Sequence, residues 1–176
     1  MNSSIKIKRV ILIVLIILNC STIFYFSNQV ADDSSAESSR FVEFISEVLP
    51  SIKNMQEPDK TNLKENILTP IVRKTAHLSI YTLLGILTYS LSLTYDVETK
   101  KRILYSLLFC ICYAMTDELH QIFVDGRSGE IRDILIDFIG ASIGIIIIQC
   151  IKNIKGKIER KNNSNGWKSR YTTCNI

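Results

Sequence analysis

Three groups of polar and ionisable side chains interrupt long apolar stretches of this sequence, and each combines residue types that bind ligands or transfer protons. The groups fall in 73–81, 117–121 and 127–137. An arginine can hold a phosphate or carboxylate with two hydrogen bonds, and a histidine beside a carboxylate can transfer a proton. The candidate ligand-binding residues are Arg73, Lys74, His77, Tyr81, Asp117, Glu118, His120, Gln121, Arg127, Asp133 and Asp137.

Spacing within the groups indicates that their members share helix faces. Arg73, His77 and Tyr81 are four residues apart and therefore stack along one face of a helix. The two aspartates of the third group are likewise one turn apart. Charged groups inside an apolar segment cost free energy, so we expect them to face the interior of a bundle and to pair there. We expect Arg73 or Lys74 to be the cationic partner of Asp137.

Two kinds of chemistry are consistent with these residues. In the first, the cations bind an anionic headgroup while the carboxylates hold them in place. In the second, a histidine acts as general base or nucleophile, a carboxylate orients it, and an arginine stabilises developing negative charge. The candidate catalytic residues for this second reading are His77, Asp117 and His120.

A metal site is a further alternative, because carboxylates and imidazole bind several divalent ions. Its ligands would come from His77, His120, Asp117 and Asp137. Their spacing, however, does not match H-E-x-x-H, and the five cysteines include no C-x-x-C pair. The sequence therefore predicts no metal and no cofactor.

Four apolar segments must position the polar groups. Hydrophobic residues make up 47% of the 176, and most of them lie in these segments. Each is about 17 to 23 residues long, which as a helix spans roughly 30 Å of lipid hydrocarbon. This excludes a soluble two-domain enzyme and predicts an all-α, multi-pass membrane protein with a bundle of four transmembrane helices, the first an uncleaved span. The segments are Val10–Phe26, Ile71–Leu93, Ile103–Phe123 and Ile134–Ile151.

Lysine and arginine residues predict the orientation of these spans. They are concentrated before the first span, between the second and third, and after the fourth, whereas cytoplasmic flanks of membrane proteins are typically basic. Both termini are therefore predicted to be cytoplasmic, in a cell membrane. The start of the second span, the end of the third and the start of the fourth then share one depth near the outer leaflet, and the three polar groups with them.

The sequence divides into a four-span domain at 10–151, a cytoplasmic N-terminus at 1–9 and a basic cytoplasmic tail at 152–176, predicted to be disordered. Apolar residues at helical spacing in 41–49 predict a short amphipathic helix at the membrane interface between spans one and two. The small residues Gly140, Ala141 and Gly144 predict close approach of another helix to span four.

Several motifs together resemble the VanZ-like family of small multi-pass membrane proteins. They occur in the family's order, although Asp125 stands where the family tends to have proline before Gly-Arg. The motifs are Phe26-Ser-Asn-Gln29, Arg73-Lys-Thr-Ala-His77 with Tyr81 and Gly85, Asp117-Glu-Leu-His-Gln121, Gly126-Arg127, and Asp133 with Asp137, Gly140 and Gly144.

The resemblance implies an accessory role, because the family's namesake contributes to resistance to the lipid-tailed glycopeptide teicoplanin. We therefore expect a non-enzymatic membrane protein whose outward polar pocket binds a membrane lipid or lipid-linked amphiphile, with antibiotic resistance or cell-envelope lipid handling as its outcome. An intramembrane enzyme acting on an outer-leaflet lipid is the alternative, and a transporter is disfavoured because no charged path crosses the spans. A second copy of the chain and other envelope proteins are further candidate partners. Nucleic acid is not expected.

Overall fold

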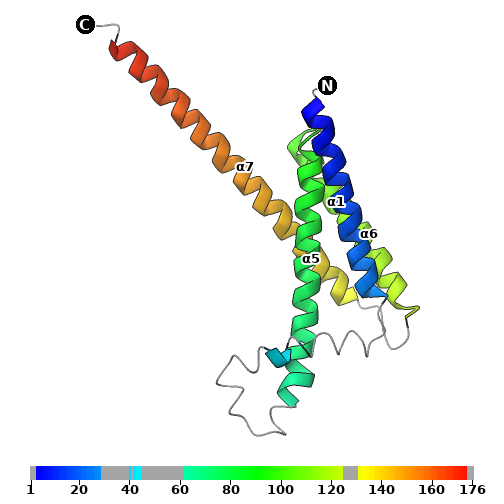
Figure 1. Ribbon diagram of the computed structural model, residues 1–176. Coiled ribbons are helices and arrows are strands. Elements are labelled where there is room, and N and C mark those ends of the chain that lie inside the picture. The colour runs from blue at the N-terminus through cyan, green and yellow to red at the C-terminus, as the bar shows by residue number, and fades with distance from the viewer. Residues whose placement is uncertain (1–2, 29–39, 41, 45–61, 125–130, 174–176) are drawn as a thin grey trace.

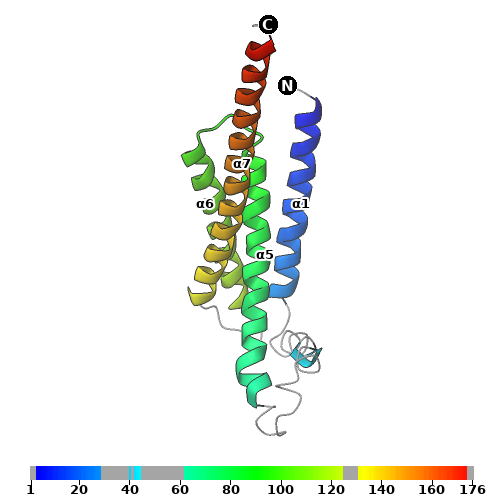
Figure 2. The ribbon, with the colours of Figure 1, turned by 90° about the vertical axis from the view of Figure 1, so that its left-hand side faces the viewer.

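The computed structural model describes residues 3–28, 40, 42–44, 62–124 and 131–173, and the described part is helical without strands. Helix α1 spans Ser3–Ser27, α5 spans Thr69–Ser92, α6 spans Thr99–Gln121 and α7 spans Ile131–Thr173. A π-helical turn, η1 (Lys64–Leu68), leads directly into α5. Helices α1, α5 and α6 lie alongside one another and α7 crosses α5 (Figures 1 and 2). The all-α prediction is confirmed.

The most extensive helix contact joins α5 to the first half of α7. Backbone approaches backbone here, because a Cβ atom at Gly140 would lie 2.5 Å from the carbonyl oxygen of Leu78, and one at Gly144 would overlap that of Thr82. Conversely, a Cβ at Gly85 would overlap the carbonyl of Ala141. The close approach predicted from small residues on span four is thus present.

One register relates α5 to α7. The side chains of Lys74 and Tyr89 contact residues of α7 that are 59 and 60 positions further along the chain, Asp133 and Gln149. Partner numbers rise together on the two helices, so these helices run parallel. The glycine contacts fix how far one helix can slide along the other, and this sets which polar residues meet.

Helix α1 packs against both α5 and α6. Its apolar inner face joins the core, and the buried Asn19 donates a hydrogen bond to the carbonyl of Ile80 at 3.4 Å. The hydroxyl of Tyr113 on α6 donates to the carbonyl of Cys20 at 2.6 Å. Polar contacts of this kind fix the rotation of an apolar helix that has many equivalent apolar faces.

Much of the outer surface of the bundle is apolar. Large hydrophobic side chains remain exposed along α1, the outer face of α6 and the first half of α7. Among the described helices, Ser3–Ser27 and Ile131–Lys161 are long and apolar enough to cross a membrane. Helices α5 and α6 carry the charged groups and do not meet this criterion, so the four-span arrangement stays a prediction.

The tail, which the sequence predicts to be disordered, is described as helical over 152–173. Helix α7 continues without a break to Thr173 and extends away from the bundle (Figure 1). The segment 151–161 contains no proline and is rich in lysine and other good helix formers, which explains its continuation as a helix. Most of the predicted interfacial helix at 41–49 lies outside the described residues. Its described part, 42–44, is helical.

Candidate functional site

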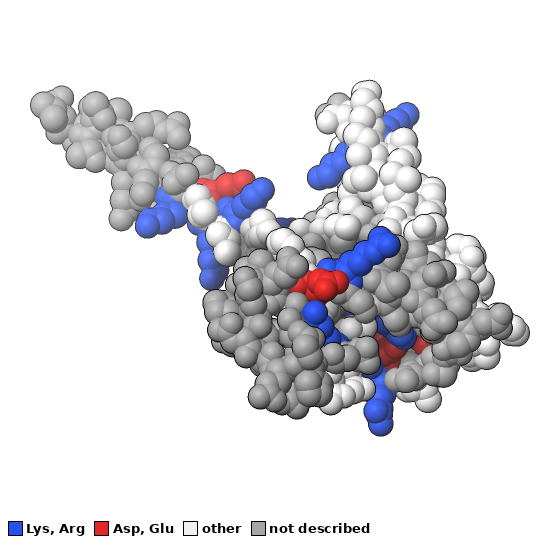
Figure 3. Space-filling view, turned by 60° about the horizontal axis from the view of Figure 1, so that its bottom comes forward, with Lys and Arg blue, Asp and Glu red and all other residues white. Residues whose placement is uncertain are grey.

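The three polar groups meet at one end of the bundle, where α5 begins, α6 ends and α7 begins. The two chain termini lie toward the other end (Figure 1). Figure 3 views the polar end, and in its described part acidic and basic side chains lie next to one another. The gathering of the described polar residues at one end of the bundle is therefore a feature of the fold.

The centre of the site is formed by one residue from each of three helices: His77 of α5, Asp117 of α6 and Asp137 of α7. One ligating atom from each lies within 4.8 Å of the other two. Asp137 is fully buried, Asp117 is 4% exposed, and the Nδ1 atom of His77 lies 3.6 Å from an oxygen of Asp137. Their predicted proximity is thus confirmed, although 40 and 60 residues separate His77 from the two aspartates.

Three further buried polar side chains lie near this centre. The hydroxyl of Tyr81 is buried one turn beyond His77, with no hydrogen-bond partner in the part of the chain that the structure describes. The side chain of Gln121, also buried, donates to an oxygen of Asp117 at 3.3 Å. Glu118 is buried on the same turn of α6. The site therefore brings carboxylates, an imidazole and a phenol together where three helices meet.

The cations lie closer to the end of the bundle. The ammonium of Lys74 pairs with Asp133 at 2.9 Å, and the side chain that faces Asp137 is His77, so the predicted pairing of Asp137 with Arg73 or Lys74 is wrong. The register of α5 on α7 explains this, because Lys74 is level with Asp133, whereas His77 is level with Asp137. Arg73 is half-buried and makes no hydrogen bond or ion pair within the described residues. Among the described residues of the site, Arg73 therefore supplies a guanidinium that is available to a ligand.

His120 does not join the central cluster. Its ring stacks on Phe24 of α1 with 4.7 Å between centroids, and its Nε2 atom lies 3.2 Å from the amide oxygen of Asn28. The sequence groups it with Asp117 because they are three residues apart, but it packs against α1. Arg127, the remaining predicted residue, lies outside the described residues.

Sequence reasoning did not assign to the candidate site two buried polar residues that α1 brings to this half of the bundle, although one of them, Ser27, belongs to the motif that begins at Phe26. Asn19 is 6% exposed and Ser27 is 1% exposed, and the Ser27 hydroxyl has no hydrogen-bond partner among the described residues. An asparagine inside an apolar helix was the available signal, because such a residue is expected to bond to a neighbouring helix.

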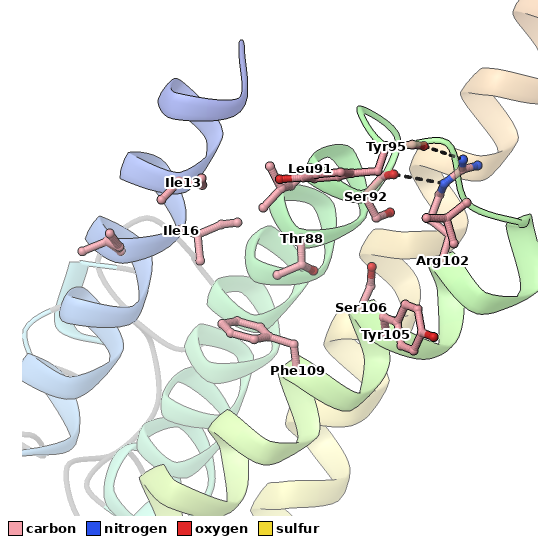
Figure 4. Close-up of a pocket in the computed structure, with 12 residues that line it drawn as sticks. Ile13, Ile16, Thr88, Leu91, Ser92, Tyr95, Arg102, Tyr105, Ser106 and Phe109 are labelled. Atoms are coloured by element: carbon pink, nitrogen blue, oxygen red, sulfur yellow. Dashed lines mark hydrogen bonds between the residues drawn. The ribbon is translucent and has the colours of Figure 1, made fainter. Parts of the chain in front are cut away.

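An apolar cavity of about 510 Å³ lies in the other half of the bundle, between α1, α5 and α6. Its lining includes Ile13, Ile16 and Phe109, and Arg102 closes one end by donating to the carbonyls of Ser92 and Tyr95 (Figure 4). None of the predicted site residues lines this cavity. It is therefore separate from the candidate site.

Comparison with known proteins identifies the family. A model of the VanZ/LLP1 family matches residues 11–152, which is most of the chain. The chain belongs to the VanZ/LLP1 family. Within this match lie most of α1, all of α5 and α6 and the first part of α7, and with them every residue of the central cluster. The VanZ/LLP1 region ends within α7, at residue 152. No curated protein and no solved structure matches the chain.

Proposed function

We propose that this VanZ/LLP1 protein is a multi-pass membrane accessory protein whose polar site binds the anionic headgroup of a membrane lipid or lipid-linked amphiphile at the outer leaflet. Through that binding it contributes to tolerance of teicoplanin-type glycopeptides or to cell-envelope lipid handling. The family membership and the two apolar helices support a membrane protein. The exposed apolar side chains around the bundle support contact with lipid.

The proposal rests on the surroundings of Arg73. This residue is half-buried without an ion-pair partner among the described residues, one position before a lysine that is paired with Asp133. A guanidinium offers two parallel donors to a phosphate or carboxylate, and a partly desolvated one binds such a group more strongly than an exposed one. A headgroup entering from the end of the bundle would meet Arg73 before the buried carboxylates.

Orientation in the membrane decides which leaflet the site serves, and single-cysteine labelling tests it. We expect an impermeant thiol reagent to label intact cells at Ser38→Cys and not at Lys100→Cys or Ser164→Cys, each in a chain without its five native cysteines. The basic flanks at the opposite end from the site are the physical reason. Labelling after permeabilisation provides the control. Reaction at Ser164→Cys in intact cells would relocate the site to the cytoplasmic leaflet.

The functional test is Arg73→Gln, expressed in a teicoplanin-sensitive Gram-positive host at the wild-type level. We expect wild type to raise tolerance to teicoplanin more than to a glycopeptide without a lipid tail, and Arg73→Gln to remove the gain by abolishing the bidentate contact. Arg132→Gln is the matched control, because Arg132 is exposed at the same end of the bundle and should retain wild-type tolerance.

Membrane abundance must be equal for the three proteins, so that a loss of tolerance reports binding and not folding. Equal tolerance in the wild-type strain and the empty-vector strain would contradict the resistance role. Lipids that co-purify with wild type in mild detergent but not with Arg73→Gln, identified by mass spectrometry, would then still support headgroup binding. Their absence would contradict it.

An intramembrane enzyme is the second candidate, and the geometry of His77 beside the buried Asp137 favours it specifically. A carboxylate that orients an imidazole is the usual arrangement of a general base. Incubation of the purified protein with labelled membrane lipid separates the two functions. Product formation supports the enzyme, whereas saturable binding without product supports the accessory role.

A further inference from the structure

The central cluster has the composition and geometry of a metal site. His77, Asp117 and Asp137 each come from a different helix, and each offers one possible ligand atom, with all three atoms within 4.8 Å of one another. In the part of the chain that the structure describes, these three residues are the group of metal-ligating side chains (histidine, cysteine, aspartate or glutamate) that lies this close together. An imidazole nitrogen with carboxylate oxygens is a donor set that Mn²⁺ and Zn²⁺ accept.

Distances within the cluster favour an ion over a direct hydrogen bond. The Nδ1 atom of His77 and the nearest oxygen of Asp137 are 3.6 Å apart, beyond the range of an N–H···O hydrogen bond. Two ligands bound at about 2.1 Å to one ion are roughly 3.0 to 3.5 Å apart, depending on whether the angle between them is octahedral or tetrahedral. The observed separation is therefore close to that of two ligands on one ion.

Burial supplies a second and independent observation. Asp137 is fully buried, and neither of its oxygens has a hydrogen-bond partner within the described residues. The Nδ1 atom of His77 and the hydroxyl of Tyr81 also have none there. Buried polar groups nearly always have partners, and a buried carboxylate needs a compensating positive charge. A divalent cation between the three side chains supplies that charge.

We propose that His77, Asp117 and Asp137 bind one divalent transition-metal ion, for which Mn²⁺ is the best probe. The carboxylates favour Mn²⁺, whereas Zn²⁺ would also bind to the cysteines of the chain. Three protein ligands leave further coordination positions open toward Tyr81 or a bound oxygen donor. This inference does not depend on the proposed function, because it concerns the binding of the metal alone.

The experiment titrates Mn²⁺ into the full-length protein, purified in mild detergent without an affinity tag and stripped with a chelator. Free Mn²⁺ is measured by electron paramagnetic resonance. We expect wild type to bind one equivalent and the melting temperature to rise with Mn²⁺. His77→Gln should weaken binding by at least the roughly 10- to 100-fold that loss of an outer-shell partner costs. His120→Gln, which alters the histidine stacked on Phe24, should bind as wild type does.

Asp137→Asn is the second variant, and it keeps the shape of the side chain in case His77→Gln does not fold. It should lose Mn²⁺ binding and the rise in melting temperature. Absence of saturable binding in wild type would overturn the proposal, and so would equal affinity of wild type and a folded His77→Gln or Asp137→Asn protein. Wild-type Mn²⁺ binding without co-purifying lipid would support the metal site and contradict the proposed headgroup binding.

Discussion

Gly144→Val is expected to prevent α5 and α7 from packing in the observed register and to cost about 3 kcal/mol or more, at the upper end of overpacking effects. Even a Cβ at this position would overlap the carbonyl oxygen of Thr82 and lie 2.9 Å from the amide nitrogen of Ile86. Both are backbone atoms, so no rotation of a side chain can relieve the overlap. The measurement is the fraction of monodisperse protein that survives heating in detergent.

Gly156→Ala is the matched control, because Gly156 lies on the same helix and a Cβ there would meet no atom within 4 Å. We expect this variant to be as stable as wild type or more so, since alanine favours a helix by about 1 kcal/mol over glycine. If Gly144→Val were as stable as Gly156→Ala, the close crossing of α5 and α7 would be incorrect. The alignment of His77 with Asp137, which depends on that crossing, would then need revision.

Asp137→Ala is expected to destabilise the metal-free protein by about 3 to 5 kcal/mol, because without an ion the imidazole of His77, 3.6 Å away, is the partner that the buried carboxylate has, and removing one partner of a buried pair is costly. The substitution removes the carboxylate that faces His77 and leaves the imidazole and the Tyr81 hydroxyl in a low-dielectric interior. Asp137→Asn should lose less, because the amide keeps the volume and one acceptor oxygen. Thermal unfolding in detergent with a chelator present is the measurement.

Glu159→Ala provides the comparison for this series, since Glu159 is an exposed carboxylate on the same helix. Its effect should stay within about 0.5 kcal/mol, as for most surface substitutions. Equal stabilities of Asp137→Ala and Glu159→Ala would show that the fold does not use the buried carboxylate. A larger loss for Asp137→Asn than for Asp137→Ala would contradict the pairing with His77.

These two predictions concern one structural relation. Glycines that let α5 and α7 approach also bring Asp133 and Asp137 level with Lys74 and His77. A change at Gly144 should therefore disturb the polar site about two helical turns away, although Gly144 contacts none of the site residues in that cluster. The affinity of a folded Gly144→Ala protein for Mn²⁺, compared with that of wild type, would measure this coupling directly.

The sequence by itself determined the helical class, the end of the bundle at which the polar groups gather and the family. Apolar segments of similar length with basic flanks at alternate junctions predict one common depth for 73–81, 117–121 and 127–137, whatever the packing. Charge at that depth requires partners, so the meeting of His77, Asp117 and Asp137 followed from the cost of leaving them unpaired. These inferences need only local periodicity and composition.

Only the tertiary structure decided which partner each residue has. Helical periodicity places Arg73, His77 and Tyr81 on one face, but the partner across the interface depends on how far one helix slides and rotates on another. The backbone contacts at Gly140 and Gly144 set that register, and in this register Lys74 pairs with Asp133. His120 lies outside the cluster because the rotation of α6 places its ring against α1. Non-local packing of this kind has no signature in a single sequence.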